Sequence, residues 1–199
     1  MEIINQIKTG IIATSFLEWI AFIFSLSYVY LAAKKNNWCW ISALISSGIY
    51  IYLCFLGQLF IEAYLQFFYF AMAIFGWIIW KKPEINSQNL IRWSYKTHLI
   101  NIAFSSIIAL ILGYIFDHYT LQANAYLDAF ITSFSLVATY MVAKKVVDNW
   151  LYWIVIDFAS IFLYSSRGLY LTAVLYLTFT LFAAYAYFSW LKKFKLQDA

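Results

Sequence analysis

Charged residues are scarce in this sequence. Only 11% of its 199 residues are charged, while 65% are hydrophobic. A soluble domain has too small an interior to bury that much apolar surface, so the composition predicts an integral membrane protein. The formal net charge is only +4 at pH 7, and no feature of the sequence indicates a nucleic-acid partner.

Residue patterns that several functions require are also absent. Cys39 and Cys54 fall on one predicted helix, about 22 Å apart at roughly 1.5 Å per residue, so we expect no disulfide between them. His98 and His118 lie at opposite membrane faces, which excludes a shared metal site. The sequence contains no phosphate-binding glycine loop, nucleotide-hydrolysis motif or nucleophile arrangement. It therefore predicts no cofactor, no enzyme activity and no use of bound nucleotide as an energy source.

Long apolar runs occupy most of the chain instead. They are about 17 to 24 residues long, close to the roughly 20 residues that a helix needs to cross the hydrocarbon core. The predicted fold class is therefore an all-α integral membrane protein. Seven spanning helices are predicted, at 11–33, 38–56, 59–80, 98–116, 124–143, 150–166 and 168–190.

Lysine and arginine residues are distributed unequally between the two sides of these spans. The side that holds the N-terminus has only Lys8 and Arg167, and the other side has the remaining eleven of the thirteen. Because basic residues accumulate in cytoplasmic loops, the N-terminus is predicted outside and the C-terminus inside the cell. Glu18 and Asp128 lie towards the outer side, where they either line the entrance and attract cations or remain solvated at the surface.

The sequence resembles itself at a spacing of 110 residues. This similarity predicts two three-helix units, 11–80 and 124–190, separated by a linker and a fourth helix at 81–116. One extra crossing gives both units the same orientation, which is the parallel-repeat class of transporter. The matching positions are Glu18 and Asp128, Ser25 and Ser135, Tyr30 and Tyr140, and Ala33-Lys34-Lys35 and Ala143-Lys144-Lys145.

The third predicted span combines aromatic and polar side chains on one stripe. Gln66, Tyr69 and Trp77 belong to this stripe, because steps of three and four residues keep side chains on one helix face. Gln66 either contacts a ligand or joins two helices through a hydrogen bond. Trp80 precedes two lysines and is predicted to be an anchor at the membrane interface.

The sixth predicted span places an acid near mid-membrane. Trp150, Trp153 and Asp157 share one helix face through the spacing i, i+3, i+7. A carboxylate in hydrocarbon costs about 3 kcal/mol, so it indicates a function. Two aromatic rings and one acid suit a flat cationic molecule. The alternatives are that Asp157 carries a proton or packs in its neutral form, and that Trp150 is an interface anchor.

Two motifs resemble signatures of the Pnu family of bacterial vitamin transporters. The resemblance extends over nearly the whole chain and implies a three-plus-one-plus-three fold like that of full-length SWEET sugar transporters. It also implies a bacterial cytoplasmic membrane location, a homotrimer, and uptake of a vitamin precursor by facilitated diffusion. A cytoplasmic kinase then traps the substrate by phosphorylation. The motifs are Leu65-Gln66-Phe67-Phe68-Tyr69 with Gly76-Trp77-Ile78-Ile79-Trp80, and Asn149-Trp150-Leu151-Tyr152-Trp153-Ile154-Val155-Ile156-Asp157.

Carried over residue by residue, the resemblance implies substrate contacts at Gln66, Tyr69, Trp77, Trp150, Trp153 and Asp157. Position 157 departs from the nicotinamide riboside branch of the family, which has asparagine there. Nicotinamide riboside and thiamine both have a permanently positive ring and suit a carboxylate, whereas riboflavin is neutral and gains least. The expected substrate is nicotinamide riboside, with thiamine, and proton-coupled vitamin transport, as the alternatives.

Overall fold

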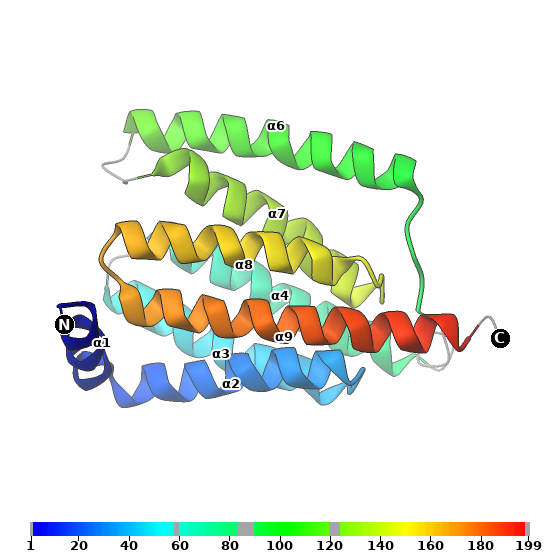
Figure 1. Ribbon diagram of the computed structural model, residues 1–199, viewed down its shortest axis with the longest axis horizontal. Helices are drawn as coiled ribbons and strands as arrows, with labels where there is room; N and C mark the ends of the chain where they lie inside the picture. The colour runs from blue at the N-terminus through cyan, green and yellow to red at the C-terminus, as the bar shows by residue number, and fades with distance from the viewer. Residues whose placement is uncertain (1, 58–59, 83–89, 120–123, 198–199) are drawn as a thin grey trace. The chain divides into compact units, whose positions relative to one another are not determined.

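The chain is helical throughout most of the part that the structure describes. The computed structural model describes residues 2–57, 60–82, 90–119 and 124–197, so part of the predicted linker, 83–89, lies outside the described residues. The predicted all-α class is confirmed. The helices are α1 (Glu2–Ala13), α2 (Phe16–Ala33), α3 (Trp38–Leu56), α4 (Phe60–Lys81), α6 (Tyr95–Tyr119), α7 (Ala125–Ala143), α8 (Asn149–Ser166) and α9 (Tyr170–Lys195) (Figure 1).

The predicted first span, 11–33, is wrong at its start. Helix α1 ends at Ala13 and α2 begins at Phe16, because Ser15 and Glu18 cap the new helix reciprocally. The Glu18 backbone N–H donates to Ser15 Oγ over 3.3 Å, and the Ser15 backbone N–H donates to Glu18 Oε2 over 2.6 Å. This arrangement is a capping box, and its S-x-x-E pattern is visible in the sequence.

Six of the described helices are long and apolar enough to cross a membrane: α2, α3, α4 from Ala63 onwards, α6, α7 and α9. Helix α8 coincides with the predicted sixth span but does not meet the same criterion. Its 18 residues include Asn149, Asp157 and several hydroxyl side chains, which lower its mean hydropathy. The count of seven spans therefore stays a prediction.

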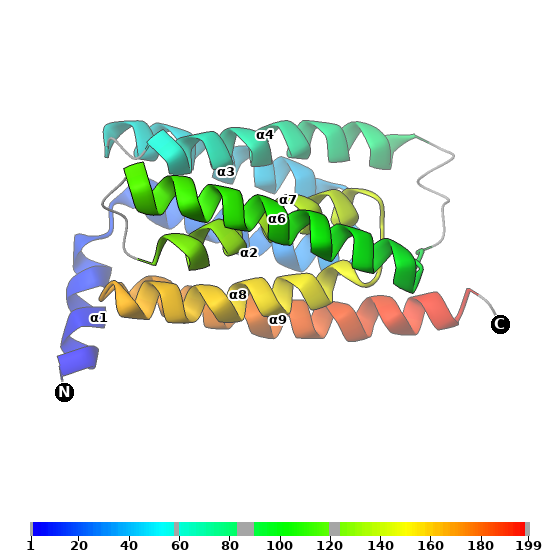
Figure 2. The same ribbon diagram turned by 90° about the horizontal axis from the view of Figure 1, so that it is seen from above.

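Contacts divide the chain into two compact units, and each is described by itself. Unit 1 contains Met1–Ala13, Arg92–Ala138 and Asp148–Ala184, and unit 2 contains Thr14–Ile91, Thr139–Val147 and Tyr185–Ala199. Within unit 1, α1 runs crosswise to α9 near the start of α9 (Figure 2), and Gly10 lies against Leu171. The predicted division at 11–80, 81–116 and 124–190 follows sequence similarity and stays a prediction.

The core of unit 1 lies between α7 and α8. Ile131, Phe134 and Ala138 of α7 pack with Ile156 and Leu163 of α8. These side chains are at most 9% exposed. Because they follow helical spacing on both elements, the face of α8 that contains Ile156 is fixed against α7.

The core of unit 2 contains a buried aromatic cluster. The ring of Trp40, which is 1% exposed, packs edge-on against Trp80 with 5.4 Å between ring centroids and lies 5.9 Å from Tyr28. A Cβ atom at Gly76 would overlap the Trp40 indole. Glycine is therefore needed at position 76 so that α4 can approach this ring.

Two tryptophans in unit 2 cap the ends of other helices. The indole N–H of Trp80 donates to the Ala143 carbonyl over 3.0 Å, and that of Trp190 donates to the Ala33 carbonyl over 2.9 Å and to the Ala32 carbonyl over 3.2 Å. The last carbonyls of a helix have no partner within it, so these indoles satisfy the ends of α7 and α2. The prediction of Trp80 as an interface anchor is wrong, because Trp80 is only 2% exposed.

Helices α2 and α7 also end in the same backbone motif. Lys35 and Lys145 have φ values of 60° and 56°, in the left-handed region. After α2, the backbone N–H of Lys35 donates to the Ala32 carbonyl, and the N–H of the next residue donates to the Leu31 carbonyl. Equivalent hydrogen bonds follow α7, and the pattern is a Schellman motif with lysine where glycine is usual.

Candidate substrate-binding site

Helix α8 presents the predicted aromatic and acidic residues on one face. It is continuous from Asn149 to Ser166, so Trp150, Trp153 and Asp157 lie along a single stripe. Trp150 is 3% exposed, and Trp153 is half-buried against the core of unit 1. The arrangement that the sequence predicts for this helix is therefore present.

Asp157 is buried without a counter-charge among the described residues. Its side chain is 5% exposed, and its carboxyl group forms no hydrogen bond or ion pair with any described residue. The neighbouring Ser160 hydroxyl donates to the Ile156 carbonyl of its own helix over 2.9 Å. A buried carboxylate is costly unless it is paired or protonated, so Asp157 needs a cationic ligand or a proton as its partner.

Helix α4 contains the second group of predicted contacts. Gln66, Tyr69 and Trp77 are half-buried, and the Gln66 amide bonds to no described residue. The ring of Trp77 packs edge-on against Trp38 at 5.8 Å, and the Lys81 amine lies 4.3 Å from its centroid. Gln66 thus has no hydrogen-bond partner among the described residues, whereas the Trp77 ring already has protein neighbours.

The six predicted contacts fall into two groups in different compact units. Gln66, Tyr69 and Trp77 belong to unit 2, whereas the α8 group belongs to unit 1. The structure brings the members of each group onto one helix. Their combination into one binding site stays a prediction.

The two acids predicted at the outer entrance have partners within the protein. Glu18 forms the capping box at the start of α2. Asp128, in the first turn of α7, accepts a hydrogen bond from Arg167 Nη2 over 2.8 Å, and both side chains are half-buried. The Arg167 charge therefore offsets that of Asp128, and any attraction of cations by this acid is reduced.

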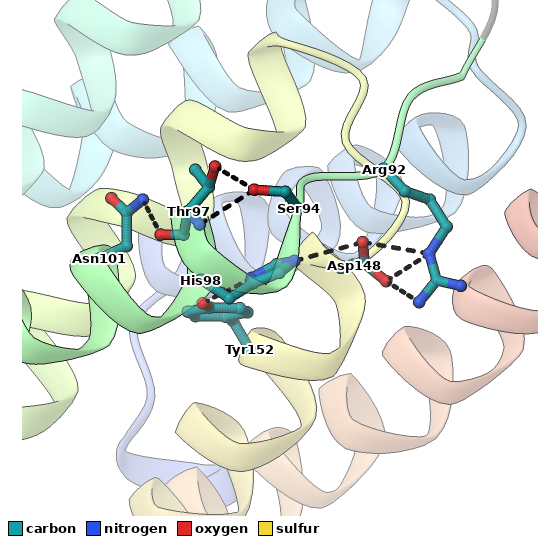
Figure 3. A network of polar contacts seen from close by, with 7 residues as sticks. All are labelled: Arg92, Ser94, Thr97, His98, Asn101, Asp148 and Tyr152. Carbon is teal, nitrogen blue, oxygen red and sulfur yellow. Dashed lines mark hydrogen bonds and ion pairs between the residues drawn. The ribbon is translucent and has the colours of Figure 1, made fainter.

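A polar network at the start of α8 was missed by the sequence-based reasoning. Figure 3 shows Asp148 beside Arg92 and His98, with His98 also facing Tyr152. In the sequence, Arg92 and Asp148 both fall between predicted spans. Their opposite charges on the same predicted membrane side were the available indication, but 56 residues separate them in sequence.

The all-helical fold and the six span candidates among the described residues are those of a multi-pass membrane protein. The chain belongs to the nicotinamide mononucleotide transporter family, whose model matches residues 15–192. The predicted membership of the Pnu family of vitamin transporters is thereby confirmed, as is the expectation that the chain is not an enzyme.

Two bacterial relatives of different specificity resemble the chain to similar extents. The nicotinamide riboside transporter PnuC of Escherichia coli (strain K12) is 26% identical over 184 residues, covering 78% of this chain and 76% of the relative. The riboflavin/roseoflavin transporter RibM of Streptomyces davaonensis is 25% identical over 158 residues, covering 76% of this chain and 73% of the relative.

A crystal structure of the vitamin B3 transporter PnuC has the same fold. Its TM-score with this chain is 0.74, at 18% sequence identity, over 97% of this chain and 90% of that chain.

Proposed function

We propose that this chain is a facilitator that takes up a cationic vitamin precursor, with nicotinamide riboside as the first candidate and thiamine as the second. The observation that carries the proposal is the buried Asp157 carboxyl group, which has no partner among the described residues and shares a helix face with Trp150 and Trp153. A permanently positive aromatic ring would pair with the acid and stack on an indole.

The relatives leave the substrate open, because their identities to this chain differ by only one percentage point, 26% and 25%. The charge of Asp157 favours the cationic candidates. Nicotinamide riboside and thiamine are cations that a buried carboxylate would stabilise, whereas neutral riboflavin would leave the carboxylate uncompensated. Phosphorylated forms would be repelled by the acid.

The proposed architecture has seven spans arranged as two three-helix units around a linker helix, with the N-terminus outside. The recurrence of helix ends at a spacing of 110 residues supports it: the C-caps of α3 and α8 are Gly57 and Arg167. In this proposal the two repeated units alternate access to the substrate in a bacterial cytoplasmic membrane. A homotrimer and trapping by a cytoplasmic kinase remain part of the proposal.

Calorimetric titration of the purified protein tests the substrate. We expect nicotinamide riboside or thiamine to bind, and Asp157→Asn to shift the preference towards nicotinamide riboside, because that branch of the family has asparagine at this position. The affinity for thiamine should fall by roughly tenfold or more, because loss of a buried charge pair is worth at least about 1.4 kcal/mol. Ser47→Ala is the matched control, since Ser47 is buried at the position 110 residues earlier and donates to the Ala43 carbonyl of its own helix. The proposal would be refuted if Asp157→Asn left the affinities for nicotinamide riboside, thiamine and riboflavin unchanged.

Proton-coupled transport is the second candidate, because an unpaired buried acid also suits a proton carrier. Uptake into liposomes with and without a pH gradient distinguishes facilitated diffusion from proton-coupled transport. Facilitated diffusion predicts equal initial rates under both conditions, and a gradient-dependent rate that Asp157→Asn abolishes would establish the second candidate instead.

A further inference from the structure

The carboxylate at the start of α8 does not cap its own helix. Asp148 occupies the N-cap position, where an aspartate side chain usually accepts a hydrogen bond from the first turn, but it makes no such bond. It instead accepts hydrogen bonds from Arg92, with Nε–Oδ1, Nε–Oδ2 and Nη2–Oδ1 distances of 3.0, 3.3 and 2.7 Å. The Asp148 side chain is 4% exposed and that of Arg92 is 47% exposed, so the carboxylate is held inside the protein while the arginine reaches it from the surface.

His98 connects the same region to α6. Ser94 caps the first turn of α6 by accepting a hydrogen bond from the backbone N–H of Thr97, and His98 follows directly. The imidazole Nε2 lies 3.4 Å from Asp148 Oδ2, and Nδ1 lies 2.9 Å from the Tyr152 hydroxyl oxygen (Figure 3). Both ring nitrogens therefore face α8, at positions four residues apart.

Tyr152 extends this network to the proposed binding face. It lies between Trp150 and Trp153 in sequence, and it packs with Trp153 against the core of unit 1. Its ring centroid is 6.5 Å from that of Phe134 on α7. Because Trp150, Tyr152 and Trp153 belong to the same turn of one α-helix, a rotation of this segment about the helix axis would move both indoles together with Tyr152.

We infer that Arg92, Asp148, His98 and Tyr152 form a positioning set that fixes the rotation of the first turn of α8, and with it the indoles of Trp150 and Trp153. The inference rests on the proposed function of that face. In it, none of the four side chains contacts the substrate. They act through α8, by joining it to the segment before α6 and to α6 itself.

The geometry of the Arg92 contact allows an oriented hydrogen-bonding role to be distinguished from a general requirement for positive charge at this position. Two different guanidinium nitrogens contact the Asp148 carboxylate, an orientation that a lysine amine does not reproduce. If only the positive charge matters, Arg92→Lys will behave as the wild type. If the oriented contact matters, Arg92→Lys will be nearly as impaired as Arg92→Gln.

The experiment measures substrate affinity by calorimetry and initial uptake rates in proteoliposomes, using nicotinamide riboside and thiamine as probes. Tyr152→Phe, Asp148→Asn and Arg92→Lys should each raise Kd and KM by roughly threefold to tenfold, the worth of one or two hydrogen bonds. The maximal rate at saturating substrate should stay within about twofold of the wild type, because the substrate contacts themselves are intact.

Two further variants serve as controls. Ser166→Ala removes the hydrogen bond from Asn124 Nδ2 to Ser166 Oγ, 2.8 Å long, at the other end of α8, and should leave affinity unchanged. Trp153→Ala alters the proposed binding face itself and should abolish binding.

The outcomes are separable. Weakened affinity in the three positioning variants with normal affinity in Ser166→Ala supports the inference. Wild-type affinity in all three, with binding lost in Trp153→Ala, overturns the inference and leaves the proposed function standing. Wild-type binding in Trp153→Ala overturns both. An equal loss in Ser166→Ala and the positioning variants overturns the inference too, because it indicates general destabilisation of α8.

Discussion

The indole caps of Trp80 and Trp190 make a quantitative prediction about stability. Each N–H satisfies a carbonyl at the end of another helix, and the two tryptophans are 2% and 0% exposed. Replacing either by phenylalanine leaves a buried carbonyl without its donor, at about 1–3 kcal/mol. It also removes part of a buried ring, which adds a cost for the space left behind.

Trp40→Phe is the matched control for this experiment. Trp40 is 1% exposed, packs against Trp80 and loses the same atoms on substitution, but its indole N–H has no hydrogen-bond partner among the described residues. The difference between Trp80→Phe or Trp190→Phe and the control therefore isolates the hydrogen bond. We expect that difference to be about 1–2 kcal/mol, and similar for Trp80 and Trp190.

Thermal unfolding of the purified variants in one detergent measures this difference. For a chain of this length, 1 kcal/mol corresponds to a shift in Tm of about 2–4 °C. Trp80→Phe and Trp190→Phe should therefore unfold below Trp40→Phe by at least that amount. A Tm for Trp40→Phe equal to or below the other two would refute the role of the hydrogen bonds, because ring volume alone would then account for the loss.

Two further predictions concern the lysines that follow α2 and α7. Lys35→Gly should raise the free energy of unfolding by about 1 kcal/mol, because glycine adopts the φ of 60° found at position 35 without steric cost. Lys34→Gly is the control, since φ at position 34 is an ordinary −81°, and it should not raise the free energy of unfolding. Thermal unfolding of the two variants measures the difference. Burial, and then the nearby Lys35 charge, lower the pKa of Lys145, so the unfolded chain retains this proton to higher pH than the folded chain. Wild-type stability relative to Lys145→Met should therefore rise as pH increases from the lowered pKa towards the ordinary lysine value of about 10.5, and a Tm difference that falls over this range would contradict the assignment.

The sequence was sufficient for most helix positions because apolar runs and their polar ends are local features. The predicted span 38–56 coincides with α3, Trp38–Leu56. The break before Phe16 was missed even though the capping pattern from Ser15 to Glu18 is local, because the apolar run continues through it and hydropathy alone cannot detect a cap.

The site was predictable only where its residues share one helix. The spacing of Trp150, Trp153 and Asp157 places them on one face of α8 without knowledge of any other element. The contact between Arg92 and Asp148 depends on two distant segments meeting, and the burial of Trp80 depends on the end of α7. The periodicity of a single helix does not show which distant segments meet, so these two interactions could be identified only from the three-dimensional structure.

Positions that match at the 110-residue spacing differ in what they do. Trp80 and Trp190 match, and both satisfy helix ends. The residues 110 before Asp157 and Trp153 are Ser47 and Ala43, and the Ser47 hydroxyl bonds within its own helix. The matched pair Trp80 and Trp190 therefore supports the fold, whereas the acid and the deeper indole occur in only one copy. A proposed binding face that is complete in only one copy suits an asymmetric substrate whose charge lies in a single ring, and this is a property of both proposed cations.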